Sequence, residues 1–272
     1  MPIHFRRLSL LVSCLALQLA FVPPSLAGVL DHGDHRGEDH SFDNHKNEDL
    51  DGIILTNANL ESINLRNTTL RDAMMASAFL LNAVLINADL TRADLTNAIL
   101  LYAILRDATL TDAIFDGADL TGANLRDATA LDAIFTGATL TEAILAHADL
   151  SGANFTNAVM TDANLGGASL VDADLSGSDI SGSNLKGADL AGANLLGADL
   201  TGIDYNSKTD FSGAFYDADT LFDPFFDTTG LVFVPEPSTM ALLTFGLTIL
   251  AFRRSRCRPP PRMRKLTPRQ GV

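Results

Sequence analysis

The dominant pattern in the sequence is an apolar residue at every fifth position, from Leu55 to Tyr205. These 31 consecutive positions, here called centres, are mostly leucine, and no insertion interrupts them. Two residues before each centre the side chain is nearly always small, and it is alanine at every fifth step from Ala73 to Ala173. A period of five matches neither an α-helix, with about 3.6 residues per turn, nor a β-strand, which alternates with a period of about two. The pattern therefore predicts a solenoid, in which each short unit buries its apolar side against copies of itself.

Polar and turn-forming residues fill the other positions of each pentad. The position just before the centre is often aspartate or asparagine, as in Asp119 and Asn124, and these side chains should face water. The position two after the centre favours glycine or asparagine, as in Gly117 and Asn57, and both residues tolerate unusual backbone angles. We therefore expect the chain to bend once per pentad, with leucine and alanine inside.

Pentads such as Ala-Asp-Leu-Thr-Gly, at residues 118–122, carry a resemblance to a known family. The sequence from 53 to 207 resembles the pentapeptide-repeat family, whose members fold as a right-handed quadrilateral β-helix with four pentads in each coil. The resemblance implies an all-β solenoid of about eight coils. It also implies that Phe115, Phe135 and Phe155, which are spaced by one coil, stack as a ladder inside the core. The pattern has three local departures. Ile63 and Thr68 replace the small residue two before a centre, and Ala130 is a small residue at a centre.

Residues 1–27 have the organisation of a secretory signal peptide. Two arginines precede an apolar run at residues 8–22, and small residues follow it. We predict export, with cleavage between Ala27 and Gly28. The alternative is a lipoprotein signal with a lipid on Cys14, but this would leave only a few apolar residues before the cysteine.

A second processing signal is predicted at residues 235–258. Pro235, Glu236 and Pro237 are followed by an apolar run from Met240 to Phe252 and then by a cluster of arginines. The run would form a helix of about 20 Å, shorter than the ~30 Å hydrocarbon core of a bilayer. This order of elements resembles the PEP-CTERM sorting signal, which implies transient anchoring in the inner membrane and processing by an exosortase. A simple membrane anchor is the alternative, and it leaves the Pro-Glu-Pro motif unexplained.

The remaining segments look like ends rather than further domains. Residues 259–272 form a basic, proline-rich tail, which departs from the usual sorting signal. Residues 208–234 lose the period of five and are rich in phenylalanine, which predicts a cap over the end of the core, with sugar or partner binding as the alternative. Residues 28–52 are acidic and rich in histidine, and we expect them to form a disordered leader.

The histidines of this leader raise the question of metal binding. The candidates are His32, His35, His40 and His45, with Asp31, Asp34, Asp39 and Asp43 beside them. Imidazole and carboxylate groups suit divalent transition metals, but a disordered segment implies no rigid geometry. We therefore predict a solvated leader, with specific binding of a divalent metal as the alternative.

The composition limits the classes of function. The chain has 33 acidic and 19 basic side chains, a formal charge of −14, which does not suit binding to nucleic-acid phosphates. Both cysteines, Cys14 and Cys257, lie in the ends expected to be processed, so neither disulfides nor thiol chemistry are expected. His147, the only histidine in the repeat, is expected at a solvent-facing turn rather than in a catalytic triad. No pattern points to catalysis or to a cofactor.

These features predict a non-enzymatic, exported structural or interaction protein at the cell surface or in the extracellular matrix of a Gram-negative-type bacterium. Loss of both processed ends would leave 9 basic and 32 acidic side chains, a net charge of −23. Besides the export machinery, such an acidic rod would have cations, extracellular polysaccharide or a protein as partners. The alternative is a cytoplasmic DNA mimic that binds DNA gyrase, as some pentapeptide-repeat proteins do, and the two export signals argue against it.

Overall fold

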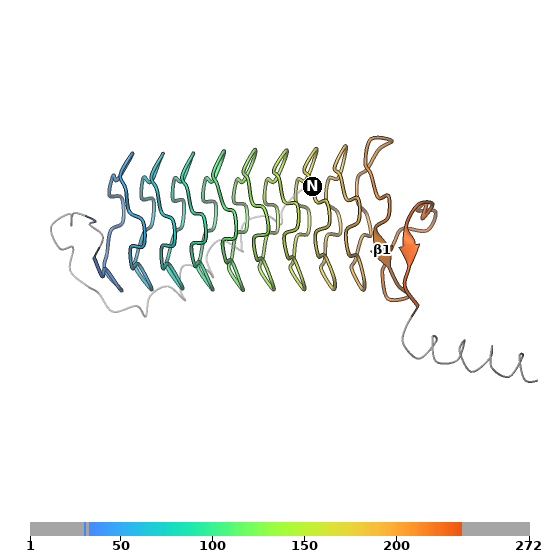
Figure 1. Cartoon of the computed structure of the whole chain (residues 1–272), viewed down its shortest axis with the longest axis horizontal. Coiled ribbons are helices and arrows are strands. Elements are labelled where there is room, and N and C mark those ends of the chain that lie inside the picture. The colour runs from blue at the N-terminus through green and yellow to red at the C-terminus, as the bar shows by residue number, and fades with distance from the viewer. Residues whose placement is uncertain (1–29, 31–32, 236–272) are drawn as a thin grey trace, which may run out of the picture. The chain divides into compact units, whose positions relative to one another are not determined.

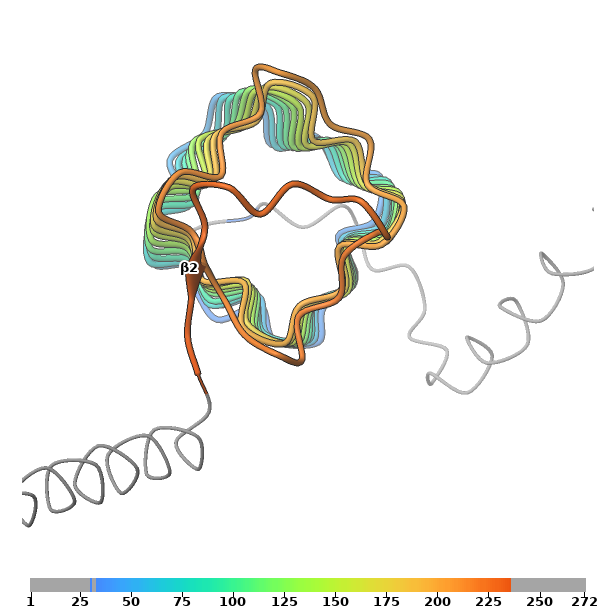
Figure 2. The same ribbon diagram turned by 90° about the vertical axis from the view of Figure 1, so that its right-hand side faces the viewer.

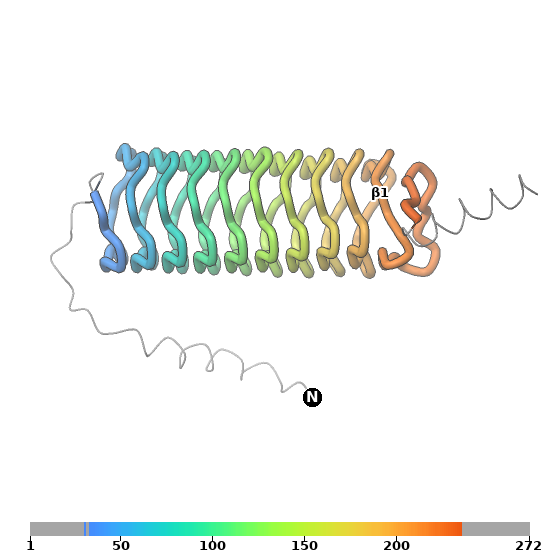
Figure 3. The backbone as a smooth tube through the Cα atoms, turned by 60° about the horizontal axis from the view of Figure 1, so that its bottom comes forward, coloured from blue at the N-terminus to red at the C-terminus, as the bar shows by residue number. Residues whose placement is uncertain are grey.

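The computed structural model of the protein describes residue 30 and residues 33–235. The chain divides into two compact units, Met1–Val232 and Phe233–Val272, and the repeat lies in the first. Within this unit the chain winds into coils that stack along one axis, from blue at residue 33 to orange near the end of the repeat (Figure 1). No described residue is helical. The smooth trace of Figure 3 shows the same stack, with each coil directly beside the next.

Parallel β-bridges hold neighbouring coils together at a register of twenty residues. They run without a break from the bridge between Asp34 and Ile54 to the bridge between Asn184 and Asp204. Backbone N–H groups donate across the same interface, for example from Leu60 to the carbonyl of Phe79 at 2.7 Å. Four pentads therefore complete one coil, and residues twenty apart in sequence lie one above the other (Figure 2).

The inward positions are those that the period of five predicts. The centres and the small residues two before them are buried, as Leu60 and Ala58 illustrate. Phe115 and Phe135 stack with ring centroids 4.9 Å apart and an interplanar angle of 5°, and Phe155 continues the stack at 4.8 Å. These separations match the spacing of about 4.8 Å between neighbouring strands, so the stacking of the coils sets the stacking of the rings.

Each pentad turns because of two local features. The residue two after the centre has a positive φ, which is 63° at Gly117 and 58° at Asn57. The aspartate before the centre accepts hydrogen bonds from the residue after it: Asp119 Oδ1 lies 3.0 Å from the backbone nitrogen of Thr121 and 2.6 Å from its hydroxyl. These aspartates stabilise turns, which accounts for the recurrent Asp-Leu-Thr sequence.

Residues 33–52 form a full coil, so the prediction of a disordered leader is wrong for them. They bridge to the next coil in the same twenty-residue register, and the backbone nitrogen of His40 donates to the carbonyl of Asn59 at 2.8 Å. The period of five continues upstream of Leu50, but the centres there are His45, His40 and His35. Because these centres are polar rather than leucine, the hydrophobic pattern did not reveal the continuation. The coil forms nevertheless, because the inter-coil hydrogen bonds are made by the backbone and do not depend on side-chain type.

The solenoid ends where insertions lengthen the coil. Asp189 bridges to Asp210 and Asp199 bridges to Leu221, so the register grows beyond twenty residues. Strands β1 (Phe215–Tyr216) and β2 (Val232–Phe233) form a two-stranded sheet here. Partly buried aromatic side chains of this segment pack against the hydrophobic core, namely Phe211, Phe222 and Phe226.

Most residues of the two processing signals lie outside the described part of the chain. These are Ala27 and Gly28 at the expected cleavage site, Glu236 and Pro237 of the sorting motif, and the apolar run from Met240 to Phe252. Pro235 is the last described residue. Among the residues that the structure describes, none belongs to a helix long and apolar enough to cross a membrane.

Candidate functional site

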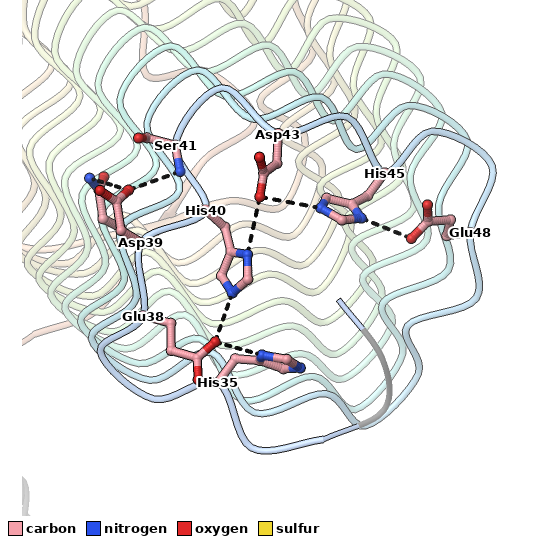
Figure 4. A network of polar contacts seen from close by, with 9 residues as sticks. His35, Glu38, Asp39, His40, Ser41, Asp43, His45 and Glu48 are labelled. Carbon is pink, nitrogen blue, oxygen red and sulfur yellow. Dashed lines mark hydrogen bonds and ion pairs between the residues drawn. The ribbon is translucent and has the colours of Figure 1, made fainter. Parts of the chain in front are cut away.

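The first coil carries a chain of alternating histidines and carboxylates inside the solenoid. The histidines are at centres and the carboxylates are at the small-residue positions, two residues before a centre, so both types point inward (Figure 4). The members in order are His35, Glu38, His40, Asp43, His45 and Glu48. In the other coils these two positions hold mainly leucine and alanine.

Glu38 joins the first two imidazoles of this chain. Its Oε2 lies 2.9 Å from His35 Nδ1 and 3.1 Å from His40 Nε2. The hydrogen bond with His35 and then that with His40 lower the pKa of Glu38, although its partial burial acts in the opposite direction. Glu38 is therefore held as an anion that accepts from both rings.

Asp43 and Glu48 continue the chain on the other side of His40. Asp43 Oδ2 lies 3.2 Å from His40 Nδ1 and 3.7 Å from His45 Nε2, and Glu48 Oε2 lies 2.9 Å from His45 Nδ1. His40 and His45 are only 2% and 6% exposed. Both buried rings thus lie between two carboxylates.

The number of protons on these rings limits the bonds they can make. A neutral imidazole has one N–H, so it cannot donate to carboxylates on both of its nitrogens. His40 faces a carboxylate oxygen with each nitrogen. The buried Nε2 of His45 has no hydrogen-bond partner among the described residues. When His45 Nδ1 donates to Glu48, the Nε2 atom of the neutral ring carries a lone pair that an electrophile beside Asp43 could accept.

The second coil supports the site from below. By the twenty-residue register, Leu60 and Leu65 lie under His40 and His45, and both are fully buried. The two sequence departures, Ile63 and Thr68, lie under Asp43 and Glu48 by the same register. The hydroxyl of Thr68 donates to the carbonyl of His45 at 3.0 Å.

Two overlapping groups of side chains have the composition of a metal site. They are His35, Glu38 and His40 in one group and His40, Asp43 and His45 in the other. In each group one ligand atom per residue lies within 4.8 Å of the other two. Two histidines and one carboxylate suit a divalent transition metal.

Sequence reasoning identified only part of this site. His32 and Asp31 lie outside the described residues. Asp39 is not a member, since its Oδ1 accepts from the backbone nitrogen of Ser41 and from Asn59 Nδ2, both at 3.0 Å. Glu38 and Glu48 were missed. Extending the period of five upstream from Leu50 would have placed both of them at inward positions.

His147 lies where the period of five places it, at an exposed turn with a φ of 62°. Its ring lies over Gly167, in the next coil, where an added Cβ would meet His147 Nδ1 at 2.6 Å. It is not part of the first-coil chain, which lies several coils away along the stack.

Comparison with protein families gives two matches. A model of pentapeptide repeats, described as eight copies, matches residues 53–92, 88–127, 133–170 and 168–204. A model of the PEP-CTERM protein-sorting motif matches residues 233–256, so the chain carries this motif. A comparison with curated proteins found no match.

Solved structures similar to the chain include two described as pentapeptide-repeat proteins, Rfr23 and HetL, and one of a resistance protein, QnrB1. Rfr23 from the cyanobacterium Cyanothece 51142 is 39% identical over 33% of this chain, with a TM-score of 0.33, and the match spans 61% of the length of Rfr23. HetL from Nostoc sp. strain PCC 7120, involved in heterocyst differentiation regulation, is 29% identical over 66% of this chain and 90% of its own, with a TM-score of 0.28. QnrB1, a plasmid-mediated fluoroquinolone resistance protein, is 23% identical over 79% of this chain and 98% of its own, with a TM-score of 0.34.

The family follows from the repeat model and from the register of the coils. The matched segments together cover more than half of the chain, and they coincide with the stacked coils. Members of this family form right-handed β-helices, and this assigns the handedness of the solenoid. The chain belongs to the pentapeptide-repeat family.

Proposed function

We propose that this protein is a non-enzymatic rod that is exported, anchored for a time in the inner membrane and displayed at the cell surface or in the extracellular matrix. The observation that carries the proposal is the PEP-CTERM motif at residues 233–256, which lies C-terminal to the repeats matched up to residue 204. An exosortase-type enzyme is the partner that such a motif implies. The apolar run from Met240 to Phe252, followed by arginines, supports a transient anchor with its basic end in the cytoplasm.

The rod itself is proposed to be a quadrilateral β-helix. Four pentads per coil, each with one turn, support a four-sided cross-section. The first coil at residues 33–52 adds one coil to the eight expected from the sequence, so we propose about nine. Its wall is acidic, and after removal of both ends the charge would be −23. Cations and extracellular polysaccharide are the partners that this surface favours in a Gram-negative-type envelope.

Mass spectrometry of the mature protein tests the proposal. The full chain, with an epitope inserted at an exposed turn, is expressed in a host with its exosortase and in the same host without it. We expect a surface or secreted form that begins at Gly28 and ends near Pro235, and a membrane-bound form with an intact C-terminus in the host without the enzyme.

Matched variants make the experiment specific. Replacement of Pro235, Glu236 and Pro237 by alanine should retain the protein in the membrane fraction, whereas Pro224→Ala, outside the motif, should leave processing unchanged. A soluble cytoplasmic pool with both ends intact would overturn the proposal and favour the gyrase-binding alternative.

A further inference from the structure

We propose that His40, Asp43 and His45 form a binding site for one divalent transition-metal ion of the zinc class, inside the first coil. The ligand atoms are His40 Nδ1, Asp43 Oδ2 and His45 Nε2. This inference goes beyond the export function, because it concerns the end of the rod that is farthest along the chain from the sorting motif.

The separations of the ligand atoms suit such an ion. Tetrahedral zinc has ligand bonds of about 2.0–2.1 Å, which places neighbouring ligand atoms about 3.3 Å apart. His40 Nδ1 and Asp43 Oδ2 are 3.2 Å apart, and Asp43 Oδ2 and His45 Nε2 are 3.7 Å apart. One ligand atom from each of the three residues lies within 4.8 Å of the others. Small side-chain rotations would therefore bring the three ligand atoms to bonding distance of one ion, and water would take the fourth tetrahedral position.

The buried Nε2 of His45 is an independent indication. It has no hydrogen-bond partner among the described residues, although the side chain is only 6% exposed. An unsatisfied buried polar atom destabilises the folded state, and folded proteins rarely retain one. A metal ion bound to this nitrogen accounts for it.

The other nitrogen of each histidine is already oriented for metal binding. Glu48 Oε2 lies 2.9 Å from His45 Nδ1, and Glu38 Oε2 lies 3.1 Å from His40 Nε2. Histidines that bind metals usually donate their second N–H to a carboxylate or carbonyl, which sets the tautomer and the angle of the ring. The first coil thus supplies both the ligands and the groups that position them.

The fold does not require histidine at these positions. Leucine fills the position of His45 in each coil below it, at every twentieth residue from Leu65 to Leu185. Leucine would bury more apolar surface there and leave no polar atom unsatisfied. In this coil three imidazoles and three carboxylates stand where the other coils have mainly leucine and alanine, and binding of a dication, which offsets the carboxylate charge, explains them.

The neighbouring group of His35, Glu38 and His40 is the weaker candidate. Glu38 Oε2 is engaged by both imidazoles, and its side chain is 52% exposed, whereas that of Asp43 is only 16% exposed. A metal is held more tightly where water competes less. Variants of His35 and His45 distinguish the two groups.

Calorimetric titration of the full, chelator-treated chain with zinc chloride tests the site. We expect one zinc ion per chain and, with cobalt(II), the visible absorption of a tetrahedral site. His45→Leu and Asp43→Asn should weaken binding roughly 100-fold. His35→Leu should weaken binding much less than His45→Leu, and the remote control His147→Asn should change the affinity less than threefold.

Two results would overturn the proposal. One is zinc affinity in His45→Leu equal to that of the wild type, and the other is loss of binding in His35→Leu with retention in His45→Leu. The leucine variants reproduce the side chain of the coils below, so they should fold. Circular dichroism without metal should show thermal unfolding at or above the wild-type temperature, so lost binding would not reflect unfolding.

Discussion

The Thr68 hydroxyl donates a hydrogen bond to the backbone carbonyl oxygen of His45 at 3.0 Å and so joins the second coil to the first. Thr68 is fully buried at a position where most pentads have alanine. Thr68→Val keeps the shape but leaves the carbonyl without this donor, and we expect the free energy of unfolding to fall by about 1–2 kcal/mol. Chemical denaturation measures this value. Thr139→Val, on the outer wall, is the control, and equal effects in both variants would contradict the interpretation.

The phenylalanine ladder should contribute strongly to stability because its middle ring has a neighbour on each side. Phe135→Ala removes a fully buried ring that stacks on Phe115 and Phe155, and we expect a loss of about 3–5 kcal/mol in the free energy of unfolding. Phe135→Leu restores the usual residue at a centre and should lose about 1 kcal/mol. Phe225→Ala, at a fully exposed ring, should have no measurable effect. A loss of less than 1 kcal/mol in Phe135→Ala would show that the core collapses around the cavity.

The turns should select residues by backbone conformation rather than by packing. Gly137 has a φ of 62°, and a Cβ built on it would contact nothing within 4 Å. Gly137→Asn should change the thermal midpoint little, because asparagine occupies this conformation at Asn157 and other turns. Gly137→Val should destabilise the protein by about 1–2 kcal/mol, since a β-branched residue is strained at positive φ. Similar midpoints for the two variants would contradict this account.

Asp51 should make the stability of the first coil depend on pH. Its Oδ2 accepts from Arg71 Nε at 2.8 Å, and this hydrogen bond lowers the pKa of Asp51 in the folded protein. Because the pKa is lower in the folded protein than in the unfolded chain, where it is about 3.9, ionised Asp51 stabilises the fold at pH values above about 3.9. This contribution is lost as the pH falls through the pKa of the folded protein. Because the pair is partly exposed, Asp51→Asn should cost only about 0.5 kcal/mol at pH 7.

Urea denaturation at several pH values tests this dependence. The difference between wild type and Asp51→Asn should vanish in acid and shrink in high salt. Asp116→Asn, at the same position of its own pentad, is the matched control and should change the free energy of unfolding at pH 7 less than Asp51→Asn. A difference that persists unchanged into acid would assign the effect to something other than this carboxylate.

Much of the fold was accessible from the spacing of residues alone. A period of five identifies Leu60 and Ala58 as inward positions, because any other assignment would expose a continuous row of leucines. A spacing of twenty between Phe115 and Phe135 is one coil, so their stacking follows once four pentads per coil are assumed. The same reasoning failed at His40 and His45. It identified buried centres by their hydrophobicity, whereas these two buried centres are polar.

The sequence by itself determined the period, the identity of the inward positions from Leu55 onward and the presence of a linear sorting motif, because each depends only on the order of residues. The tertiary structure decided that residues 33–52 join the solenoid, since that depends on backbone hydrogen bonds to the coil below. It also decided which polar groups meet. Asp43 lies between His40 and His45 only because each successive pentad turns the chain around the same core, and side chains two or three residues apart then point toward one another.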